Sequence, residues 1–308
     1  MASITQPRAR AWLALVTVWI LWGSTYLGIR VAVQTIPPLL MCGVRFLLAG
    51  SVLALAIWVT QRKRLAPLRL ADLKAVVMMG VLLLVIGTGT LSWAEVRMPS
   101  GIAALIVAGV PIWMLLIDAL FERKLKPVAL AGIAVGTAGM VALVGMPSGH
   151  VPLLVALALV GSSSSWALGS VLARRHHANH THPLFPALEM IVAGLVLCGV
   201  AALTGETRGF ALAQVTAAST AGLFWLVIMG SMVAYTAYGY AVRALPTNVV
   251  STYAYVNPIV AVILGAVILR EAITLNVLLG GATIITAVAI ILVANRRKEV
   301  ALELDDAA

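Results

Sequence analysis

The stretch PSGIAALIVAGVPIW, at residues 99–113, has the same plan as PTNVVSTYAYVNPIV, at residues 246–260. Each begins with a proline and reaches a second proline twelve residues later, at Pro111 and at Pro258. A proline inside an apolar helix removes a backbone hydrogen bond and bends or breaks the helix. The same uncommon feature at the same spacing in two distant segments indicates an internal repeat.

The beginnings of the two halves match as well. Trp22 lies 23 residues before Arg45, and Trp166 lies 23 residues before Glu189. Each of these charged residues is followed four residues later by an Ala-Gly pair. The correspondence therefore extends over most of the chain.

The composition is that of a protein embedded in a membrane. Hydrophobic residues make up 62% of the 308 residues and charged residues only 10%, whereas a soluble domain has about 25% charged residues. Apolar runs of about 20 residues, the length that crosses a hydrocarbon core, recur along the whole chain. We expect ten spans, at 11–32, 38–60, 72–95, 99–119, 127–146, 151–173, 184–204, 217–241, 247–269 and 275–294.

Five spans in each half dictate how the halves are related. An odd number of crossings turns the second half upside down relative to the first. Transporters are built from inverted repeats of this kind, with the substrate site near the middle of the bilayer between the repeats. We therefore expect an all-α integral membrane protein of ten transmembrane helices. Two inverted five-helix repeats, at 1–146 and 151–294, should surround a central cavity, and a cytoplasmic tail should follow at 295–308.

The basic residues predict the orientation. In a soluble protein the formal charge of +10 would suggest a nucleic-acid partner, but here the charges follow the positive-inside rule. With the N-terminus inside, sixteen Lys and Arg residues fall on the inner side of the membrane, four fall on the outer side, and Arg45 falls within a span. We therefore expect a multi-pass protein with both termini in the cytoplasm and no nucleic acid among its partners.

Several segments resemble the EamA-type transporters of the drug/metabolite transporter superfamily. The resemblance rests on WGSTY at Trp22–Tyr26, GVRFLLAG around Arg45, VPIW around Pro111, SWALGS around Trp166 and STYAYVNPIVAVILG at Ser251–Gly265. It covers essentially all ten expected helices. It implies a ten-helix fold with a central cavity, alternating access, and a place in the bacterial inner (plasma) membrane among exporters of amino acids and related metabolites. Members with this loop pattern are similar to exporters of aromatic and other neutral amino acids.

Two charged residues lie deep inside expected spans, Arg45 about 10 Å and Glu189 about 8 Å from the nearer end. Charges at such depth normally face protein or a water-filled cavity. Arg45 either attracts an anion or positions a helix while facing the cavity, with Ser24, Thr25 and Tyr26 as possible hydrogen-bonding partners, or reaches the interface with its long side chain. Glu189 has two explanations. It carries a coupling proton or holds a substrate ammonium, or else it is a neutral, hydrogen-bonded carboxyl group that supports packing.

Aromatic side chains concentrate in the first, eighth and ninth spans. Trp and Tyr commonly form belts at the membrane interface, which is what we expect of Trp12 and Tyr240. Rings deeper in the bilayer need partners for their polar atoms; they predict a helix seam or a cavity suited to an aromatic or amphipathic small molecule. The aromatic candidates for the cavity are Trp22, Tyr26, Trp93, Trp113, Trp166, Tyr238, Tyr253 and Tyr255.

The duplicated prolines, Pro111 and Pro258, are candidate hinges. Paired breaks in corresponding helices mark the site and the moving parts of inverted-repeat transporters. Each break is equally compatible with a fixed bend that serves packing. Asn257 is a further cavity candidate, because its amide could bond to a carbonyl group that the neighbouring proline leaves unpaired.

Other ionisable residues have simpler explanations. Glu95 and Asp118 lie near span ends, where we expect water to solvate them. The histidines between His176 and His182 fit a solvated linker between the halves better than a zinc site. We therefore predict no metal site and no cofactor.

Three classes of function compete. A membrane enzyme is disfavoured because the signatures HExxH and GxSxG are absent, and a channel has no need of two inverted halves. Phosphorylated or nucleotide-sugar cargo usually calls for several Arg or Lys in the cavity, where only Arg45 is expected. We therefore expect a secondary transporter and not an enzyme. It should export aromatic and other neutral or zwitterionic amino acids and related metabolites by alternating access. Its expected partners are a small-molecule substrate, the lipid bilayer and, if Glu189 titrates, a proton.

Overall fold

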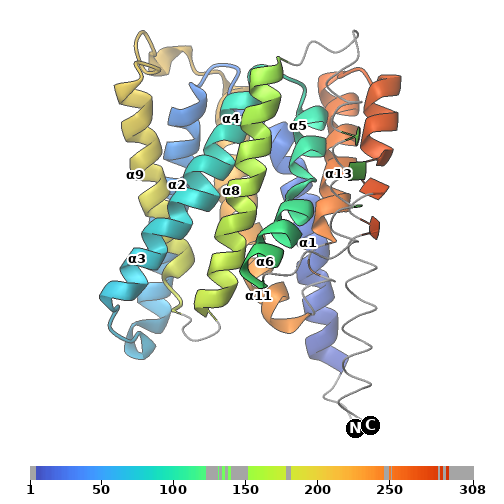
Figure 1. The fold of residues 1–308 in the computed structure, drawn as a ribbon. Helices are drawn as coiled ribbons and strands as arrows, with labels where there is room; N and C mark the ends of the chain where they lie inside the picture. The colour runs from blue at the N-terminus through green and yellow to red at the C-terminus, as the bar shows by residue number, and fades with distance from the viewer. Residues whose placement is uncertain are drawn as a thin grey trace, which may run out of the picture.

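The structure of the chain is a computed structural model, and all regular structure among the residues that it describes is helical (Figure 1). The described residues are 5–122, 131, 134–135, 138–139, 152–177, 182–245, 250, 252–283, 285–286 and 289–290. In chain order the elements are α1 (Thr5–Ala32), α2 (Pro38–Gln61), η1 (Arg62–Arg64), α3 (Leu70–Met79), η2 (Gly80–Gly89), α4 (Thr90–Glu95), α5 (Ser100–Val107), α6 (Val110–Glu122), α8 (Leu153–His177), α9 (Phe185–Leu203), η3 (Leu212–Gln214), α10 (Ala217–Trp225), η4 (Leu226–Val233), α11 (Ala234–Ala244) and α13 (Tyr253–Leu269), and residues 275–283 are also helical.

Within the described part of the chain, six continuous helical segments are long and apolar enough to cross a membrane. Two are composite: α3, η2 and α4 form one rod over Leu70–Glu95, and α10, η4 and α11 form another over Ala217–Ala241. Shorter apolar helices lie at Ser100–Met114 and Val256–Leu269 and contain the repeated inner prolines Pro111 and Pro258. These elements match the expected spans to within a few residues. The expected span at 127–146 lies largely outside the described residues, so the ten-helix arrangement as a whole stays a prediction.

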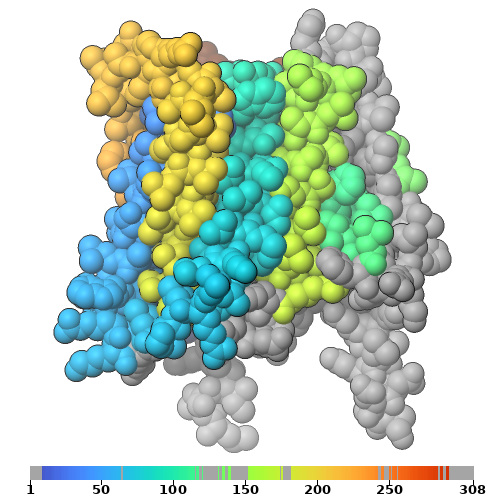
Figure 2. Space-filling model, turned by 60° about the vertical axis from the view of Figure 1, so that its left-hand side comes forward, coloured from blue at the N-terminus to red at the C-terminus, as the bar shows by residue number. Residues whose placement is uncertain are grey.

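The outer surface of the helices is apolar. On α2, Leu55 is 60% exposed and Trp58 is 52% exposed, and on α13 Val267 is 74% exposed. Apolar side chains in such numbers fit hydrocarbon and not water. Figure 2 shows one such face, where α9, the rod over Leu70–Glu95 and α8 lie side by side. We call the end of the molecule where α1 begins the lower face, and the end where α1 finishes the upper face.

The helices α2 and α9 approach each other through glycines. A Cβ atom added at Gly194 would lie 2.8 Å from the carbonyl oxygen of Gly43, and one added at Gly50 would lie 2.7 Å from that of Ala187. The two halves match at an offset of 144 residues (166 − 22, and also 189 − 45). This offset carries Gly43 to Ala187 and Gly50 to Gly194, so each of these contacts is the counterpart of the other. A twofold relation between two helices produces such reciprocal contacts.

The third span of each half contains a π-helical segment, η2 at Gly80–Gly89 and η4 at Leu226–Val233. Shifting η2 by the same 144 residues gives 224–233, which includes all of η4. Single π turns are rare inside α-helices and are frequent at functional sites. The two halves therefore share an irregularity that the hydrophobic pattern did not predict.

The two repeated inner prolines lie in different local structures. A turn at residues 108–109 separates α5 from α6, and Pro111 is the second residue of α6, a position where the missing N–H costs little. Pro258 instead lies inside α13. Motion at either position stays a prediction.

Replacing Gly194 by Ala should lower the free energy of unfolding by about 1–3 kcal/mol, because the new methyl group would overpack the contact with α2. Gly199, on the same helix, has nothing within 4 Å of a Cβ atom. Gly199→Ala is therefore the matched control and should leave stability unchanged or slightly raised. Thermal unfolding of the purified variants measures both, and equal melting temperatures would contradict the close approach.

Candidate functional site

A cavity of about 110 Å³ lies at the centre of the helices, lined by residues from both halves of the chain. Because one water molecule needs only about 10–15 Å³, the cavity is large enough to hold more than a single trapped water. The predicted residues on its wall are Trp22, Tyr26, Arg45, Trp166, Tyr253, Asn257 and Pro258.

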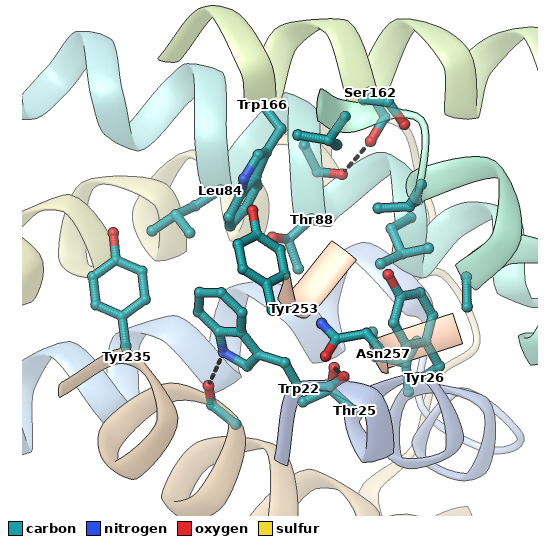
Figure 3. A pocket seen from close by; sticks show the side chains of 18 of the residues that line it. Trp22, Thr25, Tyr26, Leu84, Thr88, Ser162, Trp166, Tyr235, Tyr253 and Asn257 are labelled. Atoms are coloured by element: carbon teal, nitrogen blue, oxygen red, sulfur yellow. Dashed lines mark hydrogen bonds between the residues drawn. The ribbon is translucent and has the colours of Figure 1, made fainter. Parts of the chain in front are cut away.

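The indole ring of Trp22 is the centre of an aromatic cluster (Figure 3). Its ring centroid is 4.9 Å from that of Tyr238 and 5.4 Å from that of Tyr253. The rings of Trp166 and Tyr235 follow at 6.3 and 6.5 Å. Tilted and edge-to-face arrangements at these distances are favourable for aromatic pairs. The cluster joins α1 to α8, α11 and α13 and gives the cavity a wall on which a flat ring or an apolar side chain can lie.

Arg45 lies on the cavity wall and is only 5% exposed. Its Nε donates to the Ser231 hydroxyl at 2.9 Å, and its guanidinium lies 5.1 Å from the centre of the Phe46 ring. Among the described residues, its Nη1 has no hydrogen-bond partner. A buried guanidinium with a free donor is suited to an anionic group such as a carboxylate.

The local backbone makes this placement of Arg45 possible. A Cβ atom at Gly230 would lie 2.8 Å from the methyl carbon of Thr25 and 3.1 Å from Nη2 of Arg45. The alternative in which Arg45 extends to the membrane interface is therefore wrong, since the cavity and not the interface holds its side chain. The expected hydrogen-bonding neighbours are also corrected. The hydroxyl groups of Ser24 and Thr25 donate to carbonyl groups of their own helix.

Side chains from the first span of each half bond to carbonyl groups of the π segments. Trp22 Nε1 donates to the Gly230 carbonyl in η4 at 3.2 Å. Ser162 on α8 donates to the Gly87 carbonyl in η2 at 2.7 Å, and Ser165 donates to that of Leu82 at 2.9 Å. Polar backbone in hydrocarbon must find partners inside the protein, so these bonds stabilise the irregular turns beside the cavity.

Glu189 is 5% exposed and lies behind the cavity wall. The hydroxyl group of Tyr235, which does line the cavity, donates to Oε2 of Glu189 at 3.0 Å. The carboxyl group therefore reaches the cavity through a tyrosine and not directly.

Asn257 bonds to backbone groups of α1 and of its own helix, α13. With its amide nitrogen turned towards them, it donates to the carbonyl oxygen of Trp19 at 3.1 Å and to that of Tyr253 at 3.2 Å. The carbonyl group that Pro258 leaves without its α-helical partner is that of Ala254, four residues earlier. Asn257 thus ties α13 to α1, which differs from the expected role.

Some predicted residues lie elsewhere. Trp93 and Trp113 are not among the described residues on the cavity wall. The Arg97 guanidinium covers the ring of Trp93 at 4.2 Å, near the upper face. Tyr238 lies one ring behind the wall, in the aromatic cluster. The side chain of Tyr255 lies outside the described part of the structure, as do the side chain of Asp118 and most of the histidine loop.

The cavity also contains polar residues that the sequence analysis did not select. These are Thr88 on η2, Ser162 and Ser163 on α8, and Ser231 on η4. A run of four serines at 162–165 inside an apolar span was the available signal, since buried hydroxyl groups need partners.

An all-helical, apolar molecule with a partly polar cavity lined by two matching halves has the features of a membrane transporter. The chain belongs to the EamA-like transporter family, whose sequence pattern matches it twice, over residues 9–145 and 153–293. It is thus a transporter by family, and the duplication found in the sequence is one of the family domain.

Proteins with similar sequences are also described as transporters. The chain is 42% identical over 258 residues to the "Uncharacterized inner membrane transporter YedA" of Escherichia coli (strain K12), covering 82% of this chain and 80% of that protein. It is 26% identical to the "Probable amino-acid metabolite efflux pump" of the same organism, covering 89% and 91% of the two chains. A solved crystal structure with 20% sequence identity superposes with a TM-score of 0.65, covering 93% of this chain and 98% of the other, and so has the same fold.

Replacing Ser162 by Ala should lower the free energy of unfolding by about 1 kcal/mol, because the buried Gly87 carbonyl loses a hydrogen bond. Ser164→Ala is the matched control, since the Ser164 hydroxyl bonds only within its own helix turn, to Gly161, and its effect should stay within about 0.5 kcal/mol. Thermal unfolding of both variants compares them. A larger loss for Ser164→Ala would contradict the role given to Ser162.

Proposed function

We propose that the chain exports neutral or zwitterionic amino acids, aromatic ones among them, and related small metabolites. Transport takes place by alternating access, with the substrate held in the central cavity. The observation that carries the proposal is the pairing of an aromatic wall around Trp22 with a buried guanidinium at Arg45 that keeps a free donor. The relative described as an amino-acid metabolite efflux pump supports the same substrate class.

The two ends of an amino acid find different surroundings in this cavity. The carboxylate fits Nη1 of Arg45, because a planar guanidinium binds carboxylates in a fixed geometry. An aromatic or apolar side chain fits the rings of Trp22 and Tyr253, and the ammonium group fits the ring faces by cation–π attraction. The hydroxyl groups of Thr88 and Ser163 add hydrogen-bonding positions on the wall.

The cargo is more weakly charged than a phosphorylated metabolite. Of the described residues on the cavity wall, Arg45 is the only one with a charged side chain. Phosphate groups carry about two negative charges and are usually held by several basic groups. Neutral or zwitterionic solutes therefore fit this wall better than nucleotide sugars.

Alternating access is supported by the matching of the two halves. The reciprocal glycine contacts of α2 and α9 and the paired π segments are features expected of inverted repeats. We propose that the lower face is cytoplasmic, since exposed basic residues such as Arg62 and Lys63 lie there. In this orientation both termini are in the cytoplasm of a cell whose inner membrane holds the protein, and Pro111 and Pro258 act as hinges.

Counterflow into proteoliposomes tests the substrate class. Vesicles loaded with one unlabelled amino acid are diluted into its radiolabelled form, and a panel of neutral, acidic and basic amino acids and sugar phosphates is compared with empty vesicles. The proposal predicts accumulation for neutral amino acids, greatest for those with aromatic side chains. Accumulation of sugar phosphates alone would overturn the substrate class.

Arg45→Lys should weaken apparent affinity for the exchanged amino acid by about 10–100-fold, the effect of losing a charge-assisted hydrogen bond worth about 1.5–3 kcal/mol. Arg97→Lys is the matched control, because Arg97 lies at the upper face and bonds to the carbonyl group of Trp93. The affinity of the Arg97→Lys variant for the amino acid should match that of the parent protein. An amino-acid amide, which lacks the carboxylate, should bind the parent and the Arg45→Lys variant with similar affinity. An unchanged affinity of Arg45→Lys for the acid would refute the anchor.

Glu189→Gln should slow counterflow, because a carboxyl group joined to the wall through Tyr235 can take part in the cycle only if it can ionise. The Gln amide oxygen can still accept the hydrogen bond from Tyr235, whereas Tyr235→Phe removes that bond and leaves the carboxyl group in place. If the ionisable group matters, the Gln variant is slower than the Phe variant and loses its response to pH. Initial rates equal to the parent at every pH would remove Glu189 from the mechanism.

A further inference from the structure

A second buried carboxyl group lies at the upper end of the molecule. Glu95 is the last residue of α4, yet it is 0% exposed, so the expectation that water solvates it is wrong. Within the described part of the chain, neither of its carboxyl oxygens has a hydrogen-bond partner. The guanidinium of Arg30 donates to the backbone carbonyl of Glu95 and not to its carboxyl group.

The charged and titratable groups around Glu95 come from three segments. They are Arg30 and Tyr26 on α1, Arg45 on α2, and Glu271 in the connection after α13. Both arginines are directed to other partners, Arg30 to a backbone carbonyl and Arg45 to Ser231. An ionised carboxylate buried without a hydrogen bond costs several kcal/mol, and a neutral acid costs far less. In this conformation the site is therefore suited to a protonated Glu95.

Glu95 takes part in one of two contacts that join helix ends at the upper face. Arg30 joins the end of α1 to the end of α4 through the Glu95 carbonyl. The Glu271 carboxylate accepts from the Ser100 N–H at 3.1 Å and from the Ser100 hydroxyl at 2.9 Å, joining the end of α13 to the start of α5. We call these two contacts the upper closure. Tyr26, which interacts electrostatically with the Glu95 carboxyl group, lies on the cavity wall, so Glu95 links the closure to the cavity.

We propose that Glu95 is a proton-binding site that controls the upper closure. The carboxyl group holds a proton while the closure is shut and the site is dry. When α1, α4 and α5 separate, water reaches Glu95, its O–H bond breaks and the proton passes to that water, leaving a solvated carboxylate. Closing requires that a proton from the same aqueous side bind again. This inference rests on the proposed alternating access and assigns its pH control to one residue.

Thiol labelling measures how often the upper closure opens, and it needs no substrate. The reporter is Ile29→Cys, since Ile29 lines the cavity near the upper end of α1 and is 1% exposed. The two native cysteines, Cys42 and Cys198, are replaced by Ser and Ala. The labelling rate with a water-soluble maleimide is divided by that of Gln214→Cys, an exposed position on the upper face. The ratio cancels most of the pH dependence of the thiol reaction itself.

The expected result is a ratio that rises between about pH 6 and about pH 8, by up to tenfold per unit for one linked proton. With Glu95→Gln, a permanently neutral isostere, the ratio should be low and independent of pH. Glu95→Asp, which can still ionise, should restore the rise. A rise that persists in Glu95→Gln, or a ratio that never changes with pH in the parent, would overturn the proposal.

Glu206 supplies the matched control. It is a partly buried carboxyl group of the upper face outside the upper closure; partial burial raises its pKa, and a hydrogen bond from the Leu39 N–H opposes that rise. Glu206→Gln should keep the pH response of the parent, and its loss there would move the titrating group away from Glu95. If counterflow finds no substrate, the proposed function fails while the labelling result still decides the role of Glu95. If counterflow succeeds and Glu95→Gln labels like the parent, only the inference about Glu95 fails.

Discussion

The structure depends on one constraint, that backbone N–H and C=O groups inside hydrocarbon must find partners within the protein. A regular helix meets it unaided, and the outer surfaces of α2, α9 and α13 are correspondingly simple and apolar. Regular helix gives way to π-helix at η2 and η4, and Pro258 removes one backbone hydrogen bond inside α13; residues of all three line the cavity. At each, a polar side chain beside the irregular turn completes hydrogen bonds with nearby backbone carbonyls. The cavity is therefore held together by the groups that also give it polar character.

That arrangement relates the chemistry of the cavity to its capacity to move. Gly230 shows the connection: its carbonyl accepts from Trp22, and its lack of a side chain lets Arg45 approach Ser231. A shift of η4 against α1 would therefore change the aromatic wall and the guanidinium together. The glycine contacts of α2 and α9 bring the two halves close enough for such a shift to involve both.

Much of this was predictable from sequence, and the failures have physical causes. Hydrophobic length located the helices, and Trp22 and Arg45, chosen because they lie deep in their spans, do line the cavity, since a deep charge and a deep indole both require a polar interior. The π segments could not be predicted, since one extra residue per turn leaves the apolar pattern intact. Trp93 was misplaced because aromatic composition does not say which side of a helix faces the cavity. Glu95 was misjudged because distance along a helix does not reveal what packs over its end.

The central claim is that two opposed halves enclose a cavity that opens to each side in turn. Double electron–electron resonance on the protein in lipid nanodiscs measures it directly. One spin-label pair is placed at Arg97 and Gln214 on the upper face, and another at Lys63 and Arg175 on the lower face. All four are exposed positions. Each pair joins the first half to the second. The account predicts that saturating substrate lengthens one distance and shortens the other. Distances that stay fixed, or that lengthen together, would contradict it.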